Sequence, residues 1–174
     1  MGKVIALGEA VKLAEAARRG GKKIVTTNGA FDILHLGHVR YLKKAKRLGD
    51  LLFVGINSDI SVRKYKGKNR PVTPEKERAE IVASLESVDY AFVFSGREPS
   101  AWIARIKPDI HVKSGDYRLS SQLRDKSGAY RKDVIIEQSA VERNGGRVVL
   151  LPLEKTKSTT ERIESILEKF SGRR

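Results

Sequence analysis

Short apolar runs alternate with helix-like segments along this chain, and this alternation constrains the fold more than any other feature of the sequence. The runs are rich in β-branched and aromatic residues and are too short to be helices, so they predict buried strands. Strands that alternate with helices form βαβ units and a parallel sheet. The predicted strands are residues 24–27, 51–56, 90–94, 109–113 and 147–151.

The segments between these runs have helical patterns, and several carry end signals. Thr73-Pro74 places a capping hydroxyl before a proline at a first helical position, and Ser158 and Glu161 have the spacing of a capping box. The predicted helices are residues 36–48, 75–87, 98–106, 134–144 and 159–170, with an amphipathic surface helix within residues 1–21. The predicted fold class is therefore α/β: a Rossmann-like, open, mainly parallel sheet of five strands with helices on both faces. Such sheets bind ligands at the carboxyl ends of their strands.

The length of 174 residues fits a single domain, residues 1–174, with residues 1–21 as a helical extension. Two stretches, residues 58–73 and 116–133, are polar, basic and weakly periodic, and we predict long loops there. Loops of that length in a compact domain are usually functional or disordered.

Composition narrows the class of function. Lysine and arginine number 35 against 21 acidic residues, and the net charge of +14 predicts attraction to polyanions or to multiply charged small molecules. The absence of cysteine excludes thiolate nucleophiles, disulfides and zinc–thiolate sites, and a reducing cytoplasm suits it. No apolar run approaches the ~20 residues of a membrane span, so the sequence predicts a soluble protein without a membrane partner.

The segment after the first predicted strand, residues 26–38, holds the most informative motif: TTNGAFDILHLGH. The backbone amides of a glycine-containing turn that leads into a helix favour anions. His35 and His38 are three residues apart, so both imidazoles emerge on one side of the first helical turn. Gly37, between them, carries no side chain that would obstruct a phosphate. Imidazoles so placed can donate hydrogen bonds to an α-phosphate and to the bridging oxygen of a departing pyrophosphate.

A metal site is the alternative interpretation of two neighbouring histidines. No third ligand accompanies them at suitable spacing, and a zinc hydrolase would also need a nearby glutamate. We therefore assign no metal ligands. The third histidine, His111, alternates within a strand pattern and is interpreted as structural.

At this point the chain resembles a known family. NGAFDILHLGHVRYLKKAKRLGD, residues 28–50, is similar to the cytidylyltransferase-like nucleotidyltransferase superfamily, whose hallmark is an H-x-G-H motif after the first strand. The resemblance covers residues 22–168 and is greatest to the adenylyltransferase domain that makes ADP-heptose precursors. It rests further on IKPDIHVKSGDY and on GGRVVLLPLEKTKSTTERI. It implies transfer of AMP from ATP to a heptose 1-phosphate-like sugar, with release of pyrophosphate.

The resemblance also implies residue roles. Lys66 matches the phosphate-binding lysine of the family and joins His35 and His38 as catalytic. The nucleotide-binding residues that it implies are Thr27, Asn28, Gly29, Ala30, Phe31, Gly37, Lys113, Gly115, Asp116, Ser158, Thr159 and Thr160. The family more often has two glycines before the aspartate, and Ser114 departs from that pattern, which affects the detailed nucleotide contacts and not the type of reaction.

Three residues are assigned to the acceptor: Asp32, Asp59 and Arg78. Asp32 either orients its turn or faces the acceptor, and Arg78 is either a phosphate ligand or an exposed helix arginine. The segment 116–133 is longer than the family pattern and is interpreted as an insertion. The expected mechanism is direct in-line attack of the acceptor phosphate on the α-phosphorus, with Mg²⁺ accompanying ATP, and the resemblance implies a homodimer.

Several alternatives stay open. The sequence does not separate ATP from CTP, so a cytidylyltransferase acting on glycerol 3-phosphate or another phospho-alcohol is the main alternative, followed by FAD synthetase and phosphopantetheine adenylyltransferase. A non-enzymatic nucleic-acid-binding protein would also carry a net charge of +14, but aromatic residues are sparse and not interleaved with the basic ones. The enzyme hypothesis makes one spatial prediction, that His35, His38, Lys66 and Ser158 face a single anion pocket.

Overall fold

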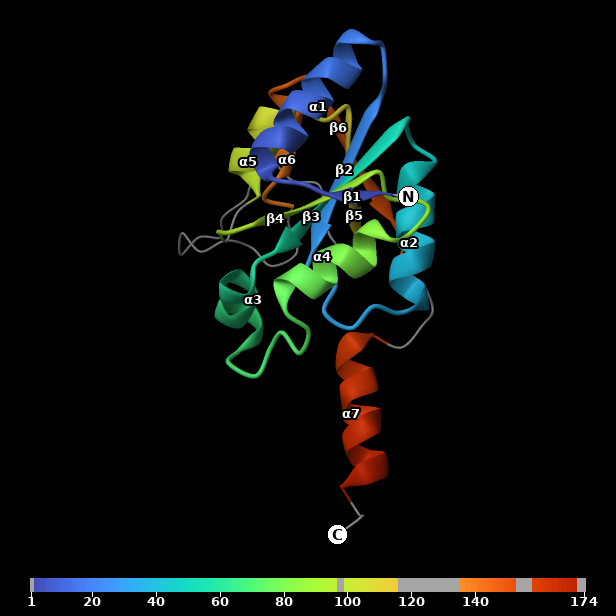
Figure 1. The fold of residues 1–174 in the computed structure, drawn as a ribbon, viewed down its shortest axis with the longest axis vertical. Coiled ribbons are helices and arrows are strands. Elements are labelled where there is room, and N and C mark those ends of the chain that lie inside the picture. Colours follow the sequence, from blue (N-terminus) through green and yellow to red (C-terminus); the bar gives the residue numbers. More distant parts are fainter. Residues whose placement is uncertain (1, 97–98, 116–134, 153–157, 172–174) are drawn as a thin grey trace.

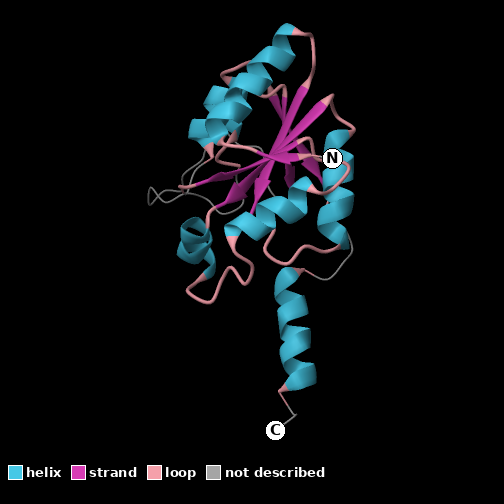
Figure 2. Ribbon diagram, in the orientation of Figure 1, coloured by secondary structure: helices cyan, strands magenta, loops and turns pink. Residues whose placement is uncertain are grey.

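The computed structural model describes residues 2–96, 99–115, 135–152 and 158–171. In these residues six strands form one open sheet in the order β1-β4-β3-β2-β5-β6, and every neighbouring pair is parallel (Figures 1 and 2). The strands are β1 Lys3–Val4, β2 Ile24–Gly29, β3 Leu51–Asn57, β4 Tyr90–Phe94, β5 Ile110–Ser114 and β6 Arg147–Leu151. The predicted α/β class and parallel sheet are confirmed.

The strand that the sequence analysis missed is β1. It has two exposed residues, which pair with Tyr90 and Ala91 at the edge of the sheet. A strand that short has no hydrophobic periodicity, so only its backbone pairing identifies it. The segment 1–21 supplies this edge strand and the predicted helix, whose Ala10 and Ala14 are fully buried.

Helices cover both faces of the sheet (Figure 2). The helices α1 (Leu7–Arg19), α5 (Ser100–Ile106) and α6 (Gln138–Glu142) pack on one face. The helices α2 (Leu36–Lys46) and α4 (Glu75–Ala83) pack on the other face. Successive residues of a strand therefore alternate between two hydrophobic cores, one on each face of the sheet. Ile24 and Phe53 belong to the first core, and Val25 and Leu52 belong to the second. This is why the strands are continuous apolar runs.

One further helix, α3 (Asp59–Lys66), lies where residues 58–73 were predicted to form a loop. Ser58 caps it by accepting a hydrogen bond from the backbone N–H of Ser61. Of its apolar residues Val62 is buried and Ile60 is exposed. The helix is only eight residues long and four of them are charged, so the segment was interpreted as part of a polar loop. The other predicted loop, residues 116–133, lies outside the described residues.

The predicted ends of α4 were partly wrong. The helix begins at Glu75 with Pro74 at the N-cap and no side-chain cap, and it ends at Ala83. The hydroxyl of Thr73 does not cap it. Instead the backbone of Thr73 contributes, because its N–H donates to Asp32 and its carbonyl accepts from Arg78.

His111 lies in β5 and is fully buried, where Nδ1 is 2.9 Å from the hydroxyl of Thr26. Burial and, to a smaller extent, the charge of Lys113 lower the pKa of His111 to about 3, against the opposing charge of Glu137. The imidazole is therefore neutral at neutral pH.

This burial predicts acid sensitivity. Below its ordinary pKa of 6.5 the imidazole takes up a proton in the unfolded chain but not in the folded one, so stability falls as the pH drops from 6.5 toward 3. The loss from this one group approaches about 1.4 kcal/mol per pH unit. Urea unfolding between pH 7 and pH 4 should show a shallower decline for His111→Gln than for the unmodified protein. Parallel declines would contradict the prediction.

Candidate active site

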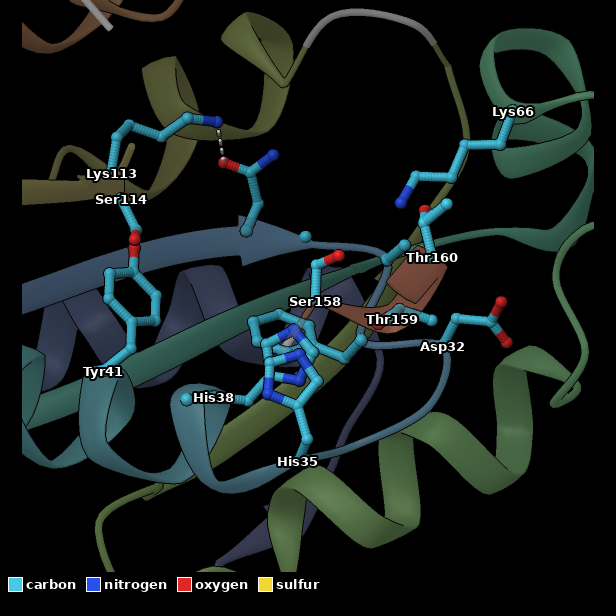
Figure 3. Close-up of a pocket in the computed structure, with 15 residues that line it drawn as sticks. Asp32, His35, His38, Tyr41, Lys66, Lys113, Ser114, Ser158, Thr159 and Thr160 are labelled. Atoms are coloured by element: carbon cyan, nitrogen blue, oxygen red, sulfur yellow. Dashed lines mark hydrogen bonds between the residues drawn. The ribbon is translucent and has the colours of Figure 1, made fainter. Parts of the chain in front are cut away.

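A cavity of ≈ 350 Å³ opens at the carboxyl ends of β2 and β5 (Figure 3). From β2 the chain proceeds to β3 on one side and later returns to β5 on the other, so the cavity lies at a topological switch point of the sheet. The predicted site residues that line it are Asn28, Gly29, Ala30, Phe31, Asp32, His35, Gly37, His38, Lys66, Lys113, Ser158, Thr159 and Thr160. Ser158 and His35 therefore share one cavity, although the sequence separates them by more than a hundred residues.

The two histidines stack on each other at the start of α2. His35 occupies the N-cap position and His38 lies in the first turn, with ring centroids 3.9 Å apart and planes 30° apart. The edge of Phe31, whose φ is +48°, contacts His38 from the turn before. A side chain at Gly29 would meet the ring of Phe31 at 3.1 Å, which accounts for the glycine there.

Both imidazoles have an unsatisfied nitrogen. Nδ1 of His35 and Nδ1 of His38 are buried, and neither has a hydrogen-bond partner in the described part of the chain. Burial is the largest cause that lowers the pKa of His38 to about 4, with smaller contributions from His35, Lys66 and Arg162. Burial also lowers the pKa of His35, again with a contribution from Arg162. The pair is thus neutral at neutral pH in a positive environment that favours an anion.

Lys66 reaches the cavity from the end of α3, on the side opposite Lys113 (Figure 3). Burial lowers the pKa of Lys66, and so does the charge of Arg70, while Asp32 opposes both. Asp32 is buried and accepts hydrogen bonds from Arg70 Nε at 2.5 Å and from the backbone N–H groups of Val72 and Thr73. Burial would raise the pKa of Asp32, but these bonds and the charge of Arg70 lower it overall.

The N-terminus of α7 (Thr159–Phe170) completes the cavity. The predicted capping box is confirmed: Ser158 Oγ accepts from the N–H of Glu161, and Glu161 Oε2 accepts from the N–H of Ser158 at 2.6 Å. Beyond its first turn the helix projects away from the sheet (Figure 1). Its amino end therefore directs backbone dipoles and hydroxyl groups at the cavity, an arrangement that favours phosphate.

This combination of an H-x-G-H turn, a lysine and a helix N-terminus matches a known family. The cytidylyltransferase-like family description matches residues 26–165. The chain belongs to the cytidylyltransferase-like family. The resemblance stated from the residues is thereby confirmed, and the chain is a nucleotidyltransferase domain.

Curated relatives agree with this assignment. The bifunctional protein HldE of Syntrophotalea carbinolica is 46% identical over 156 residues, which are 90% of this chain and 29% of that protein. HldE of Geobacter sulfurreducens is 43% identical over 89% of this chain and 29% of the relative. The chain thus spans under a third of the length of these relatives. The crystal structure of the lipopolysaccharide core biosynthesis protein from Thermoplasma volcanium has a TM-score of 0.59 and 31% identity, covering 79% of this chain and all of that one.

Two predicted acceptor ligands of this cytidylyltransferase-like domain do not line the cavity. Arg78 is fully buried and donates to the carbonyls of Thr73, Ala30 and Asn57 and to Asp59 Oδ1. Arg78 is therefore neither an exposed arginine nor a residue that lines the cavity. Its guanidinium links α4 by hydrogen bonds to the turn that precedes the histidines. Asp59 is its ion-pair partner at 2.7 Å, so the predicted acceptor role is not supported for either residue.

Other predicted nucleotide ligands have structural contacts. Thr27 is buried, and its hydroxyl bonds to Tyr41 at 2.6 Å and to the carbonyl of Val112. Gly115 follows β5 and does not line the cavity. Asp116 lies outside the described residues. Tyr41 and Ser114 also line the cavity, although neither was predicted from the sequence. Tyr41 lies three residues beyond His38 on the same face of α2.

Arg162, which was not predicted as a site residue, acts through its charge on both histidines. It lies four residues after Ser158, so it shares a face of α7 with the capping serine, and that spacing was available in the sequence. In the described residues no group of three or more His, Cys, Asp or Glu side chains gathers as in a metal site. No helix of that part of the chain has the length and apolar character needed to cross a membrane.

Proposed function

We propose that this domain transfers AMP from ATP to a heptose 1-phosphate-like sugar 1-phosphate, giving an ADP-sugar and pyrophosphate. The observation that carries the proposal is the convergence of two stacked neutral imidazoles, Lys66 and the amino end of α7 on one cavity (Figure 3). The choice of ATP and of a sugar acceptor is supported by the HldE relatives and by the lipopolysaccharide core biosynthesis protein among solved structures.

In this mechanism the triphosphate lies between α7 and the histidines. The hydroxyls of Ser158, Thr159 and Thr160 and the backbone N–H groups of Thr159 and Thr160 bind the β- and γ-phosphates, and His35 and His38 donate to the oxygens around the α-phosphorus. An acceptor phosphate oxygen attacks the α-phosphorus in line, forming a new P–O bond while the α–β bridging P–O bond breaks. Lys66 and the imidazoles stabilise the negative charge that builds on the departing pyrophosphate.

Mg²⁺ fits this scheme as part of the MgATP substrate. Asp32 is the carboxylate among the described lining residues, and its oxygens already accept from Arg70 and from two backbone N–H groups. Mg²⁺ commonly binds through substrate phosphates and water with few protein ligands. No covalent enzyme intermediate is required, because the domain acts by positioning and charge stabilisation.

The test is a panel of the four nucleoside triphosphates with several phosphorylated acceptors, including heptose 1-phosphate and glycerol 3-phosphate, read out by pyrophosphate release. We expect the highest kcat/KM for ATP with the sugar 1-phosphate. A higher kcat/KM for CTP with glycerol 3-phosphate would instead identify the domain as a cytidylyltransferase. Salt-dependent nucleic-acid binding without turnover would replace it by a binding protein.

The mechanism also predicts that MgATP binding is coupled to proton uptake. In the free protein His38 is neutral at pH 6, because its pKa is about 4. A bound polyphosphate favours the imidazolium and raises this pKa, so uptake should grow as the pH is lowered from 7 to 6. Calorimetry in buffers of different ionisation enthalpy measures it. His38→Asn, which keeps an N–H donor without titrating, is the control, and equal uptake by both proteins would contradict the prediction.

A further inference from the structure

A buried ion pair lies at the end of the cavity opposite Lys66. Lys113, on β5, donates to Glu137 Oε1 at 2.6 Å, and the side chains are 13% and 4% exposed. Glu137 directly precedes α6 and comes from a different part of the fold from the rest of the site. Burial raises the pKa of Glu137, but the charge of Lys113 and the hydrogen bonds to the carboxylate lower it overall, so it is ionised at neutral pH.

The same lysine also donates to Asn28 Oδ1 at 3.2 Å, the dashed line at Lys113 in Figure 3. An ammonium group has three donors and no acceptor, so it can bond only to the oxygen of an amide. The position of Lys113 therefore determines which way the Asn28 amide faces. Asn28 Nδ2 has no acceptor in the described part of the chain, and Asn28 lines the cavity.

This arrangement keeps Lys113 paired with Glu137. If the ammonium left the carboxylate for a ligand, Glu137 would stay buried and unpaired, which is strongly unfavourable. The lysine charge is instead compensated within the protein. The group that faces the cavity at this end is the amide –NH₂ of Asn28, which is held in one orientation.

We propose that Glu137 and Lys113 are positioning residues that hold Asn28 so that its amide –NH₂ donates to an acceptor oxygen of the bound nucleotide. This inference rests on the proposed function, because it takes the cavity to be the ATP site. Asn28 is then a nucleotide-binding residue. Glu137, which the sequence analysis did not single out, acts on the nucleotide through two other side chains.

The test measures MgATP binding by calorimetry without any acceptor, using the whole chain. Glu137→Gln and Asn28→Ala should each weaken binding by about tenfold, the value of one directed hydrogen bond. In a double-mutant cycle, Glu137→Gln should have little further effect once Asn28 is alanine. Glu142→Gln, the same substitution at the end of α6 and away from the cavity, should bind as the unmodified protein does.

The cycle also tests the direct alternative. If Lys113 itself contacted a phosphate, removal of the opposing Glu137 charge would tighten MgATP binding, and that result would overturn the inference. The inference would also be overturned if the effects of Glu137→Gln and Asn28→Ala on MgATP affinity were additive, because additivity would indicate general destabilisation. Should Glu137→Gln fold poorly, Lys113→Met/Glu137→Gln removes both charges together, which folded proteins tolerate better. This double variant should bind as weakly as Asn28→Ala, and binding at the unmodified level would refute the pair's role.

The outcomes separate the two proposals. If the unmodified chain binds MgATP and none of these substitutions alters the affinity, only the positioning inference fails. If the unmodified chain neither binds MgATP nor releases pyrophosphate with any acceptor, the proposed function itself fails.

Discussion

Replacing His38 with alanine is expected to lower kcat/KM for adenylyl transfer by about 10²–10³-fold, by analogy with the loss of one oxyanion-hole donor. The reason is that His38 faces the cavity with an unpartnered nitrogen, in a site where Lys66 and Arg162 already favour negative charge. Its contribution grows as charge develops on the α-phosphate oxygens, so kcat should fall more than KM rises. Steady-state kinetics with pyrophosphate detection measure both constants.

The matched control variants change residues at the same N-terminus of α2. Leu36→Ala truncates an exposed neighbour that does not line the cavity and should leave kcat within about twofold, as expected for a surface substitution. His35→Ala/His38→Ala should lose less than the product of the two single losses, because the stacked rings serve one phosphate. Full activity of His38→Ala, or isolation of a nucleotidylated enzyme, would overturn the mechanism.

Arg78→Met is expected to lower the free energy of unfolding by about 3–5 kcal/mol, equivalent to about 10 °C in Tm. The substitution leaves the carboxylate of Asp59 unpaired and removes donors from the carbonyls of Thr73, Ala30 and Asn57. Because Ala30 belongs to the turn before the histidines, activity should fall as well. Chemical denaturation and thermal melts measure the loss.

The control for this prediction is Arg105→Met, the same change on an exposed position of α5, which should alter stability by no more than about 0.5 kcal/mol. Arg78→Lys should recover only part of the stability, because one ammonium group cannot reach four acceptors arranged around a planar guanidinium. An Arg78→Met protein that melts like the unmodified protein but has lost acceptor affinity would restore the ligand role predicted from the resemblance.

Local patterns in the sequence were sufficient for much of the fold. The strands 90–94 and 147–151 and the helix 159–170 have the predicted bounds, since apolar runs and capping boxes act over a few residues. His35 and His38 lie together as their spacing of three predicted, although His35 is the extended N-cap residue and not part of the helix. The α/β class and the location of the cavity at the carboxyl ends of the strands follow from the alternation of strands and helices.

The tertiary structure alone decided the roles that depend on distant partners. Arg78 and Ala30 are 48 residues apart and Lys113 and Asn28 are 85 apart, so no local pattern shows that one arginine is structural or that one lysine positions an asparagine. Strand β1 and helix α3 are likewise short, with two and eight residues, and backbone pairing and capping identify them. In a sequence, a charged residue that pairs with a distant residue of the same chain cannot be told from one that binds a ligand. The residue type shows which interactions the side chain can make, and only the folded chain shows which partner it has.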